Sequence, residues 1–389
     1  MENFVFQSPT RIIFGKGAEA EVGKETKKFT KKVLLHYGGQ SIKKYGLYDK
    51  VIKSLKAENI DIFELGGVKP NPRLDLVYEG IKICRDNNID FMLAVGGGST
   101  IDSAKAIAVG VKYGGDVWDF YTSDKKAKKF LPVGVVLTIP AAGSESSNGS
   151  VITKEKGQLK KAYVDENIRP VFAILDPELT FTLPKEQTLN GISDIFAHGL
   201  ERYFTNAQNV DFSDRLIEGA FKSLIKNTYI VLDKPLDYAA RAEIMWIGLL
   251  IHNGVFGMGR IEDWGSHMIE HEISAIYDIA HGAGLSIIFP AWMQYVYKHD
   301  INRFAQFAVR VFGAETYYGD EERTALEGIK RLKNFFKEVG LPVSLEDVNI
   351  PETYLEEMSR KCTGSGEIGN FVKLDEKDVL SILKLAVKQ

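Results

Sequence analysis

Three of the seven histidines in this chain lie in one short stretch, WGSHMIEHEISAIYDIAHG, at residues 264–282. Histidine is the commonest metal ligand in proteins, and its side chain titrates nearest to neutral pH. His267 and His271 have the i, i+4 spacing that places two side chains on one face of a helix. His281 follows a predicted break near residues 277–278. The stretch therefore offers imidazoles for binding a metal or for moving a proton.

A second segment, ISDIFAHGLE, places Asp194 and His198 at the same i, i+4 spacing. Ile195, Phe196 and Leu200 make this helix largely apolar, so we expect Asp194 to be buried. A buried carboxylate needs a cation or strong hydrogen-bond donors. One carboxylate with two or three imidazoles suits Fe²⁺ or Zn²⁺ and does not select between them. The alternative is an ordinary Asp–His pair on a helix surface.

The residues HMIEH also fit the H-x-x-E-H pattern of the inverzincin metallopeptidases. In that scheme His267 and His271 bind zinc and Glu270 activates water. This alternative leaves Asp194, His198 and the glycine loops described next without a role. A dehydrogenase, by contrast, would have no need of Glu270.

The segment AVGGGSTIDSAK, at residues 94–105, lies where a predicted strand passes into a helix. Gly97 and Gly98 let the main chain approach a ligand closely, and the N-terminus of the helix offers free N–H groups and a positive dipole end. This arrangement suits a pyrophosphate, to which Ser99 could add a hydroxyl. Asp102, in the expected first turn, would complement the dipole. Neither GxGxxG nor GxxxxGK[ST] is present, and a tight turn without a ligand is the alternative.

A second glycine turn ends the run VLLHYGGQS. NAD-selective sites place an acid after such a strand, but here none occurs before Asp49. Gly39 could offer an N–H and Ser41 a hydroxyl to a 2′-phosphate, with Lys43 adding charge. We therefore predict that NADP(H) is favoured over NAD(H), with Gln40 at the position where an acid would reverse the preference. The alternative is a plain turn beside solvated lysines.

These residues need elements to position them, and the first half of the chain supplies short apolar runs that pass through glycine or proline into helical patterns. The runs are VLLHYGG (33–39), FMLAVGGGS (91–99), VGVVLTIP (133–140) and PVFAILDP (170–177). Strands alternating with helices predict a parallel sheet covered on both faces. After about residue 185 the periodicity is helical. We predict an α/β Rossmann-like domain at 1–182 and an all-helical domain at 183–389.

Composition excludes several classes of protein. The chain has 389 residues, 44% hydrophobic and 26% charged, and a formal net charge of −3, with no long basic block, so nucleic acid is not expected as a partner. No apolar run is long enough to span a bilayer, so no membrane is expected, and the N-terminus lacks the pattern of a signal peptide. Cys84 and Cys362 are too few for a disulfide framework. We expect a cytoplasmic protein.

Taken together, the sequence resembles the iron-containing (group III) alcohol dehydrogenases, and within them the branch of butanol dehydrogenases and NADPH-dependent aldehyde reductases. The resemblance rests on SPTRIIFGKGA, VKPNPRLD, AVGGGSTIDSAKAIA, TIPAAGSES, PVFAILDPELTFTLP, DIFAHGLERYF and HMIEHEISAIYDIAHG. Each segment alone is common, but their combination along nearly the whole chain is specific. It implies a Rossmann-like domain joined to a helical domain, as in dehydroquinate synthase, and a homodimer.

The resemblance also implies roles for residues of the site. Asp194, His198, His267 and His281 would bind Fe²⁺ or Zn²⁺, and His271 would be a proton relay near the nicotinamide. The metal would act as a Lewis acid on the oxygen of a primary alcohol such as butanol, or of the aldehyde. A hydride would move between the carbinol carbon and the nicotinamide.

Further residues match cofactor contacts of the family. Gly97, Gly98 and Ser99 match the pyrophosphate loop, with Asp102 behind it. Other matches are Asn71, Thr138, Lys160 and Leu179. Where relatives often carry threonines this chain has Ala141 and Ala142, and the nearby hydroxyls that could take over their contacts are those of Ser144 and Ser147.

Two alternatives share the broad architecture. A dehydroquinate-synthase-like lyase would need basic side chains for a polyanionic substrate, whereas the stretch IMWIGLLIHNGVFGMG (244–259) favours an apolar one. That stretch could equally be core. A nucleotide-binding protein without catalysis is the third alternative, and the four candidate ligands argue against it. The partner we expect is a small alcohol or aldehyde.

Overall fold

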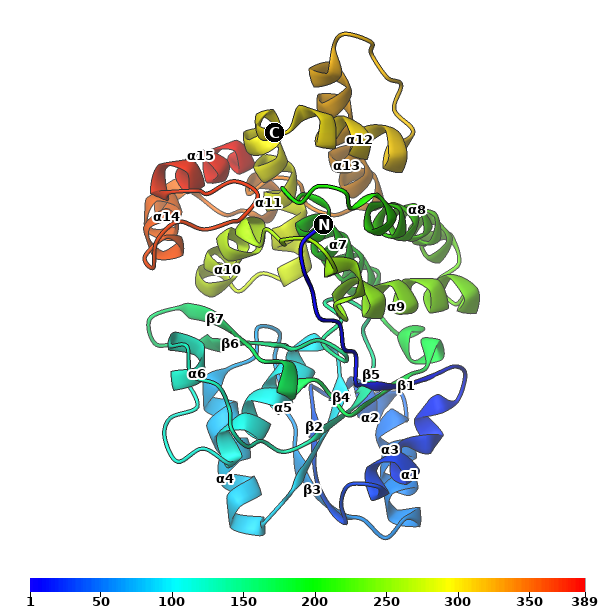
Figure 1. Ribbon diagram of the computed structural model, residues 1–389. Helices are drawn as coiled ribbons and strands as arrows, with labels where there is room; N and C mark the ends of the chain where they lie inside the picture. The colour runs from blue at the N-terminus through cyan, green and yellow to red at the C-terminus, as the bar shows by residue number, and fades with distance from the viewer. Residues whose placement is uncertain (389) are drawn as a thin grey trace. The chain divides into compact units, whose positions relative to one another are not determined.

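The computed structural model describes residues 1–388, which pack into two compact units. The α/β unit comprises Gln7–Pro184 and Pro235–Asn253. The helical unit comprises Met1–Phe6, Lys185–Lys234 and the chain from Gly254 onward. Packing thus assigns Pro235–Asn253 to the α/β unit, although a division at 182/183 would place that segment with the second domain. The predicted combination of an α/β part with a helical C-terminal part is confirmed (Figure 1).

The α/β unit is built on a six-stranded sheet in which every pair of neighbours is parallel, as predicted. Its strand order is β1-β8-β5-β4-β2-β3. The strands are β1 (Arg11–Phe14), β2 (Lys32–Tyr37), β3 (Asp61–Leu65), β4 (Phe91–Gly96), β5 (Val133–Leu137) and β8 (Phe172–Leu175). A separate antiparallel hairpin pairs β6 (Gly149–Lys154) with β7 (Leu159–Val164).

The four strands predicted from apolar runs are β2, β4, β5 and β8, and their side chains are almost all buried. Strands covered on both faces are expected to be near-continuous apolar runs. The edge strands β1 and β3 were missed because they are short and only partly buried, so their sequences, RIIF and DIFEL, lack that signal. The hairpin was also missed, because the buried side chains of LKKAYV are Lys160 and Tyr163, three residues apart, and do not follow the two-residue period of a strand.

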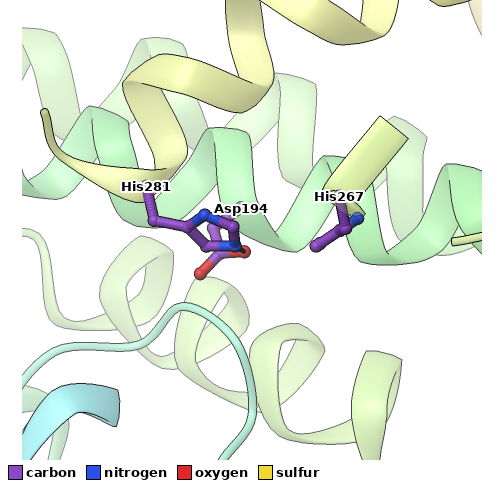
Figure 2. A group of neighbouring side chains, drawn as sticks. All are labelled: Asp194, His267 and His281. Carbon is purple, nitrogen blue, oxygen red and sulfur yellow. Dashed lines mark ion pairs between the residues drawn. The ribbon is translucent and has the colours of Figure 1, made fainter. Parts of the chain in front are cut away.

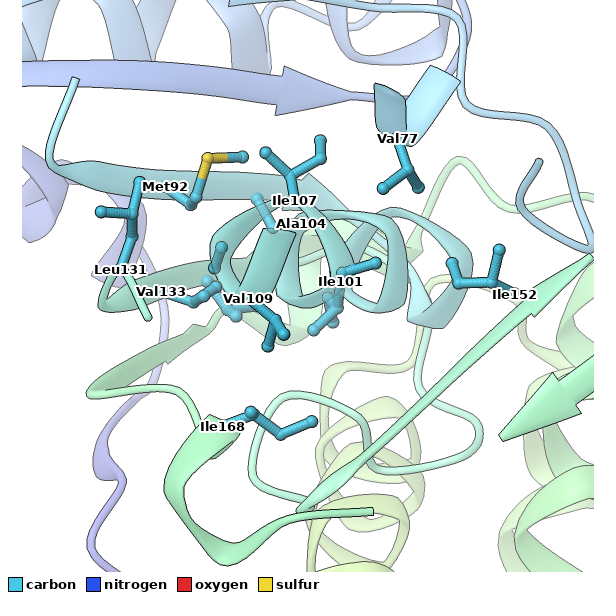
Figure 3. Close-up of a cluster of buried hydrophobic side chains, with 14 of the residues drawn as sticks. Val77, Met92, Ile101, Ala104, Ile107, Val109, Leu131, Val133, Ile152 and Ile168 are labelled. Carbon is cyan, nitrogen blue, oxygen red and sulfur yellow. The ribbon is translucent and has the colours of Figure 1, made fainter. Parts of the chain in front are cut away.

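Helices cover both faces of the sheet. The helices of the α/β unit are α1 (Val22–Lys27), α2 (Ser41–Lys44), α3 (Leu47–Ala57), α4 (Leu74–Asn87), α5 (Gly98–Val111), α6 (Asp119–Thr122) and α9 (Tyr238–His252). In Figure 1, α4 and α5 lie on one side of the sheet and α1 and α3 on the other. Each side has its own apolar core, and Figure 3 shows the one around α5, with Ile107 beside Met92.

Two glycines bring α4 and α5 into close contact. A Cβ atom on Gly80 would lie 2.4 Å from the Ile107 side chain, and one on Gly110 would lie 2.2 Å from that of Ile81. Any larger residue would push the helices apart, because protein interiors have no spare volume at this scale. The close contact fixes α5, whose N-terminus carries the predicted pyrophosphate loop.

Helix α9 accounts for most of the apolar stretch at 244–259. Its residues Met245 and Leu249 are buried in the same core as α5. The Trp246 ring meets the Phe14 ring edge-on at 5.8 Å between centroids, and a Cβ atom on Gly143 would lie 2.7 Å from Gly248 O. The buried part of α9 is therefore core of the α/β unit, and it gives no support to an apolar substrate.

The helical unit contains no strand among its described residues apart from an isolated bridge between Ile368 and Leu374. Its α-helices are α7 (Lys185–Tyr203), α8 (Asp211–Asp233), α10 (Gly265–Tyr277), α11 (His281–Val296), α12 (Ile301–Phe312), α13 (Glu321–Val339), α14 (Leu355–Cys362) and α15 (Glu376–Val387). Helix α11 is buried along nearly its whole length and packs against α7 and α10. Within residues 1–388, no helix is both long and apolar enough to cross a membrane.

Candidate metal and cofactor sites

Helix α7 carries the first candidate ligands on a segment that is buried on every side. All residues from Gly191 to Tyr203 are buried, including Asp194 and His198, so the predicted burial of Asp194 is confirmed. Such a helix contacts other elements all around its axis. The Nδ1–H of His198 donates to Asp194 O at 2.9 Å, which leaves Nε2 as the nitrogen with the lone pair.

The HMIEH segment forms the middle of α10, and the predicted break follows it. Asp278 ends α10 in the left-handed conformation, with φ of 53°, and α11 begins at His281. This turn folds the chain back, so that His281 at the start of α11 lies near His267 on α10. Their ring centroids are 5.4 Å apart.

Three of the predicted ligands form a compact group. The nearest ligand atoms of Asp194, His267 and His281 all lie within 4.8 Å of one another (Figure 2). His198 stands beside this group, with Nδ1 at 2.9 Å from Asp194 Oδ1 and its ring centroid 4.6 Å from that of His267. His267 Nε2 is buried and has no hydrogen-bond partner among the described residues, and the buried Asp194 Oδ1 lies against ring nitrogens of His198 and His281. Such atoms fit a bound divalent cation.

The protonation states also suit a metal. Burial lowers the pKa of His267, and the charges of His198 and His281 lower it further, to well below the ordinary value. Burial alone would raise the pKa of Asp194, but His198, by its charge and hydrogen bond, brings it below the ordinary value. A neutral imidazole and an ionised carboxylate are the forms that bind metals.

His271 lies at the margin of this group. It is half-buried, and its ring centroid is 5.6 Å from that of His281. Glu270, next to it in sequence, is fully buried, and its carboxylate contacts His281 Nδ1 and Ser274 Oγ. A carboxylate engaged by two donors is poorly placed to activate water, so the geometry gives no support to the peptidase scheme. The expectation that a dehydrogenase has no need of Glu270 stays untested, but it did not foresee that Glu270 contacts a candidate ligand.

Two residues of this site escaped the sequence reasoning. Glu201 is one turn beyond His198 on α7, and its Oε1 lies 2.6 Å from His267 Nδ1. Trp264 precedes α10 with a positive φ of 68°, and its ring centroid is 5.0 Å from that of His267. Glu201 could have been noticed, since it extends the face of Asp194 and His198 at i+7. The position of Trp264 had no signal in the sequence.

In the α/β unit, most of the predicted cofactor residues follow the carboxyl ends of parallel strands, which meet at one edge of a sheet. Gly39, Gln40 and Ser41 follow β2, Asn71 follows β3, Gly97 to Ser99 follow β4, Thr138 follows β5 and Leu179 follows β8. Strand β2 has β3 on one side and β4 on the other, so the order of the strands reverses between β2 and β4. These two strands are paired, with Tyr37 of β2 beside Val95 of β4. The two glycine turns therefore flank a topological switch point, where open α/β sheets bind their ligands.

The loop after β4 has the local structure expected for an anion site. Gly97 caps α5, and a Cβ atom on Gly98 would meet nothing within 4 Å, so the main chain is open to a ligand. Asp102 differs from expectation, because α5 begins at Gly98 and has no acid in its first turn. Its carboxylate instead accepts hydrogen bonds from Ser144 Oγ at 2.5 Å and Val151 N at 2.9 Å. The dipole role predicted for Asp102 is therefore wrong.

Lys105, one turn after Asp102 on α5, contacts the same segment as Asp102, residues 144–151. Its fully buried ammonium group lies 2.7 Å from Ser144 O, 3.0 Å from Ser147 O and 2.8 Å from Gly149 O. Burial lowers the pKa of Lys105 to about 8, and burial raises the pKa of the neighbouring Glu145 to about 7. Lys105 and Asp102 thus fasten residues 144–151 to the helix that carries the glycine loop.

The remaining predicted contacts lie on turns or on the hairpin. Asn71 is buried with φ of 53°, and Thr138 N donates to Gly96 O at 3.0 Å, which joins the ends of β5 and β4. Lys160 is a buried residue of β7, and Leu179 packs against the core beneath α3. The locations of these four residues do not show whether they contact a cofactor, so their roles as cofactor contacts stay predictions.

The turn after β2 is exposed from Gly39 to Ser41. It has an acidic neighbour that the sequence reasoning missed, since Glu64 comes from β3, which pairs with β2. The Glu64 carboxylate accepts hydrogen bonds from Tyr48 OH at 2.7 Å and Tyr37 OH at 3.1 Å. Lys43 Nζ lies over both tyrosine rings, 4.8 Å from the centroid of Tyr48. Its charge is therefore directed toward this cluster.

Comparison with known proteins agrees with this geometry. Residues 9–177 match the family described as iron-containing alcohol dehydrogenase, and residues 188–387 match its C-terminal family. The chain is 44% identical over its full length to the full length of probable NADH-dependent butanol dehydrogenase 2 of Bacillus subtilis. It is 38% identical, over 94% of both chains, to the NADPH-dependent aldehyde reductase YqhD of Escherichia coli.

Among solved structures, the chain is similar to NADH-dependent butanol dehydrogenase A of Thermotoga maritima. The TM-score is 0.96 at 43% identity, covering 100% of this chain and 99% of the other. Neither the peptidase nor the lyase alternative finds support in these matches. The chain therefore belongs to the iron-containing alcohol dehydrogenase family.

Proposed function

We propose that this protein is a metal- and NAD(P)-dependent alcohol dehydrogenase that interconverts primary alcohols such as butanol with their aldehydes. The observation that carries the proposal is the group of Asp194, His267 and His281, of which the first two are buried, in a chain of the iron-containing alcohol dehydrogenase family. Relatives named butanol dehydrogenase and aldehyde reductase support the substrate class.

The residues that would hold the metal are Asp194, His198, His267 and His281. One carboxylate and three imidazoles fit Fe²⁺ or Zn²⁺ equally by donor type, and the family description favours iron. The buried Asp194 Oδ1, which faces the imidazoles, and the buried His267 Nε2, which has no hydrogen-bond partner among the described residues, support this assignment. Within a fold, such atoms are costly unless a ligand satisfies them.

When bound, the metal supplies Lewis acidity to the substrate oxygen and the nicotinamide supplies or accepts the hydride. The chain's own task is to hold the ligands, to exclude water and to move one proton. We assign the proton transfer to His271, because it is half-buried and adjoins His281 without belonging to the group of Asp194. A histidine in such a position can exchange a proton with solvent.

The nucleotide would bind along Gly97, Gly98 and Ser99. Further contacts would come from Asn71, Asp102, Thr138, Ser144, Lys160 and Leu179. We favour NADP(H) over NAD(H), because the exposed turn Gly39, Gln40, Ser41 offers an N–H and a hydroxyl and contains no acid. Relatives are divided, since some are named NADH-dependent and others NADPH-dependent.

We also propose a homodimer in the cytoplasm. The edge strand β1 pairs only with β8 within the sheet of the described chain, and Phe4, Val5 and Phe6 are exposed. A symmetric contact would cover such surfaces. Light scattering of the purified protein measures the oligomeric state, and a monomer at micromolar concentration would contradict the proposal.

The experiment for the activity is a panel of alcohols and aldehydes of two to eight carbons, with NADH and NADPH, after loading with Fe²⁺ or Zn²⁺. We expect metal-dependent oxidation of NADPH with butanal. We expect His267→Ala to lose most of its metal and nearly all turnover, whereas His299→Ala, at an exposed histidine, keeps both. No turnover of any compound by the metal-loaded protein, or full metal content and activity in His267→Ala, would refute the assignment.

A further inference from the structure

Two buried glutamates, Glu201 and Glu270, contact the candidate ligands His267 and His281 at their Nδ1 atoms. Glu201 Oε1 accepts hydrogen bonds from His267 Nδ1 and from Ser266 Oγ, both at 2.6 Å. Its Oε2 accepts from Trp264 N, also at 2.6 Å. Because both oxygens are engaged, the carboxylate has one fixed orientation, and it holds the His267 ring against the start of α10.

Glu270 makes the corresponding contact with the other histidine. One of its oxygens contacts His281 Nδ1 and the other contacts Ser274 Oγ. Helix α11 lies directly over this carboxylate, since a Cβ atom on Gly284 would be 2.6 Å from Glu270 Oε1. The carboxylate is therefore packed against the main chain of α11, at a position where a side chain on residue 284 would collide with it.

These contacts determine which nitrogen of each ring is available. An imidazole whose Nδ1–H donates to a carboxylate keeps its lone pair on Nε2. In His267 that Nε2 is buried with no hydrogen-bond partner among the described residues, and in His281 it lies 3.9 Å from Asp194 Oδ1. Both rings thus present the metal-binding nitrogen to the same group.

The arrangement repeats from helix to helix. Glu201 belongs to α7 and orients a histidine of α10, and Glu270 belongs to α10 and orients a histidine of α11. We propose that Glu201 and Glu270 are positioning residues that hold His267 and His281 with Nε2 directed at a divalent cation. This inference rests on the proposed metal site and assigns a role to two acids that do not themselves bind the metal.

Removing such a partner should weaken the metal site without dismantling it. Carboxylates behind ligating histidines typically contribute about 10- to 100-fold in metal affinity. We expect Glu201→Leu and Glu270→Leu to raise the dissociation constant for Zn²⁺ by that factor. Glu201→Gln and Glu270→Gln should lose less, because the amide oxygen can still accept the Nδ1–H bond.

The test measures Zn²⁺ binding to the metal-free protein in competition with a chromophoric chelator, and the ligand-field spectrum of the Co²⁺-loaded protein. Circular dichroism of each metal-free variant establishes that it is folded, and the isosteric glutamine variants serve if a leucine variant is not. Glu218→Gln is the matched control, since Glu218 is a buried glutamate of α8 whose Oε1 accepts from Tyr203 OH at 2.9 Å. It should leave both readouts unchanged.

The outcomes separate this inference from the proposed function. Folded leucine and glutamine variants that bind Zn²⁺ as tightly as the wild type, with an unchanged Co²⁺ spectrum, would overturn the positioning role alone. An equal loss in Glu218→Gln would also overturn it, because the effect would then be general destabilisation. A wild type that binds no stoichiometric Zn²⁺ would overturn the metal site itself, and this inference with it.

Discussion

Gly282 on α11 packs against the main chain of Asn190 on α7 so closely that a Cβ atom on residue 282 would lie 1.9 Å from Asn190 O. The two helices cross at this point. His281 is adjacent to Gly282, and Asp194 is one turn beyond Asn190 on α7. The missing side chain is therefore what lets the two candidate ligands approach each other.

We predict that Gly282→Ala separates α11 from α7 and weakens metal binding at least tenfold. Overpacking of this kind usually costs about 1–3 kcal/mol of unfolding free energy. Chelator competition measures the first effect and urea denaturation the second. Gly219→Ala is the control, since a Cβ atom on that helical glycine of α8 would meet nothing within 4 Å, and the change should stabilise the helix slightly. Unchanged metal affinity in Gly282→Ala would show that the crossing does not position His281.

Lys105→Met should loosen the segment 144–151 that lies beside the glycine loop. The variant leaves the carbonyls of Ser144, Ser147 and Gly149 without the ammonium donor, and each buried group left unsatisfied costs about 1–3 kcal/mol. We expect a lower unfolding temperature and a KM for the nicotinamide cofactor that rises more than the KM for butanal. The exposed Lys112→Met, at the end of α5, should change neither. Equal effects on the two KM values would argue against a specific role near the nucleotide.

His36 predicts a dependence of stability on pH. It is fully buried, with Nδ1 donating to Leu65 O and Nε2 accepting from Ser103 Oγ, both at 2.9 Å. Burial lowers its pKa from 6.5 to about 4. The unfolded chain therefore binds more protons than the folded chain between these values, and stability is lost as the pH falls through this window.

The loss should amount to about 3 kcal/mol when the pH falls from above 6.5 to 4. Glu145, whose pKa is raised to about 7, acts in the opposite direction, so the measurement compares variants. Urea midpoints at several pH values should fall more steeply for the wild type than for His36→Gln. His299→Gln, at an exposed histidine, should follow the wild type. Parallel curves for the wild type and His36→Gln would contradict the prediction.

Gln40→Asp tests how the turn after β2 reads the cofactor. A carboxylate there would repel a 2′-phosphate and accept hydrogen bonds from a ribose hydroxyl. We expect the KM for NADPH to rise by an order of magnitude or more, and the KM for NADH to change little. Asp49→Asn is a second variant for comparison, because it removes an acid in the first turn of α3, outside the turn after β2. Equal specificity constants for the two cofactors, unaffected by Gln40→Asp, would show that this turn does not read the 2′ position.

The features of the fold and of the candidate site that depend on local spacing could be predicted from the sequence. Asp194 and His198 share a helix face because of their i, i+4 spacing, and the glycine turns follow β2 and β4 because apolar runs precede them. These features need no knowledge of distant contacts. The predicted break before His281 was likewise local.

The features that were missed arise from contacts between elements far apart in sequence. Glu201 reaches His267 only because α7 and α10 pack together, and Glu64 reaches Tyr37 only through the pairing of β3 with β2. The sequence around Lys105 did not predict its partners, since the segment 144–151 follows it by dozens of residues. Spacing predicts which side chains share an element, and tertiary packing decides which of them meet.

The assignment of α9 to the α/β unit has a consequence for synthesis on the ribosome. The chain leaves this unit after Pro184 and returns to it only from Pro235 to Asn253. Domains fold as units while the chain emerges, but the core that contains Met245 and Leu249 cannot be completed until the whole segment between these passages has been made. Part of the apolar surface of the nascent α/β unit therefore stays exposed to solvent until residue 253 has been synthesised. A chain truncated before residue 253 would keep this surface exposed, and chaperones and proteases would recognise it.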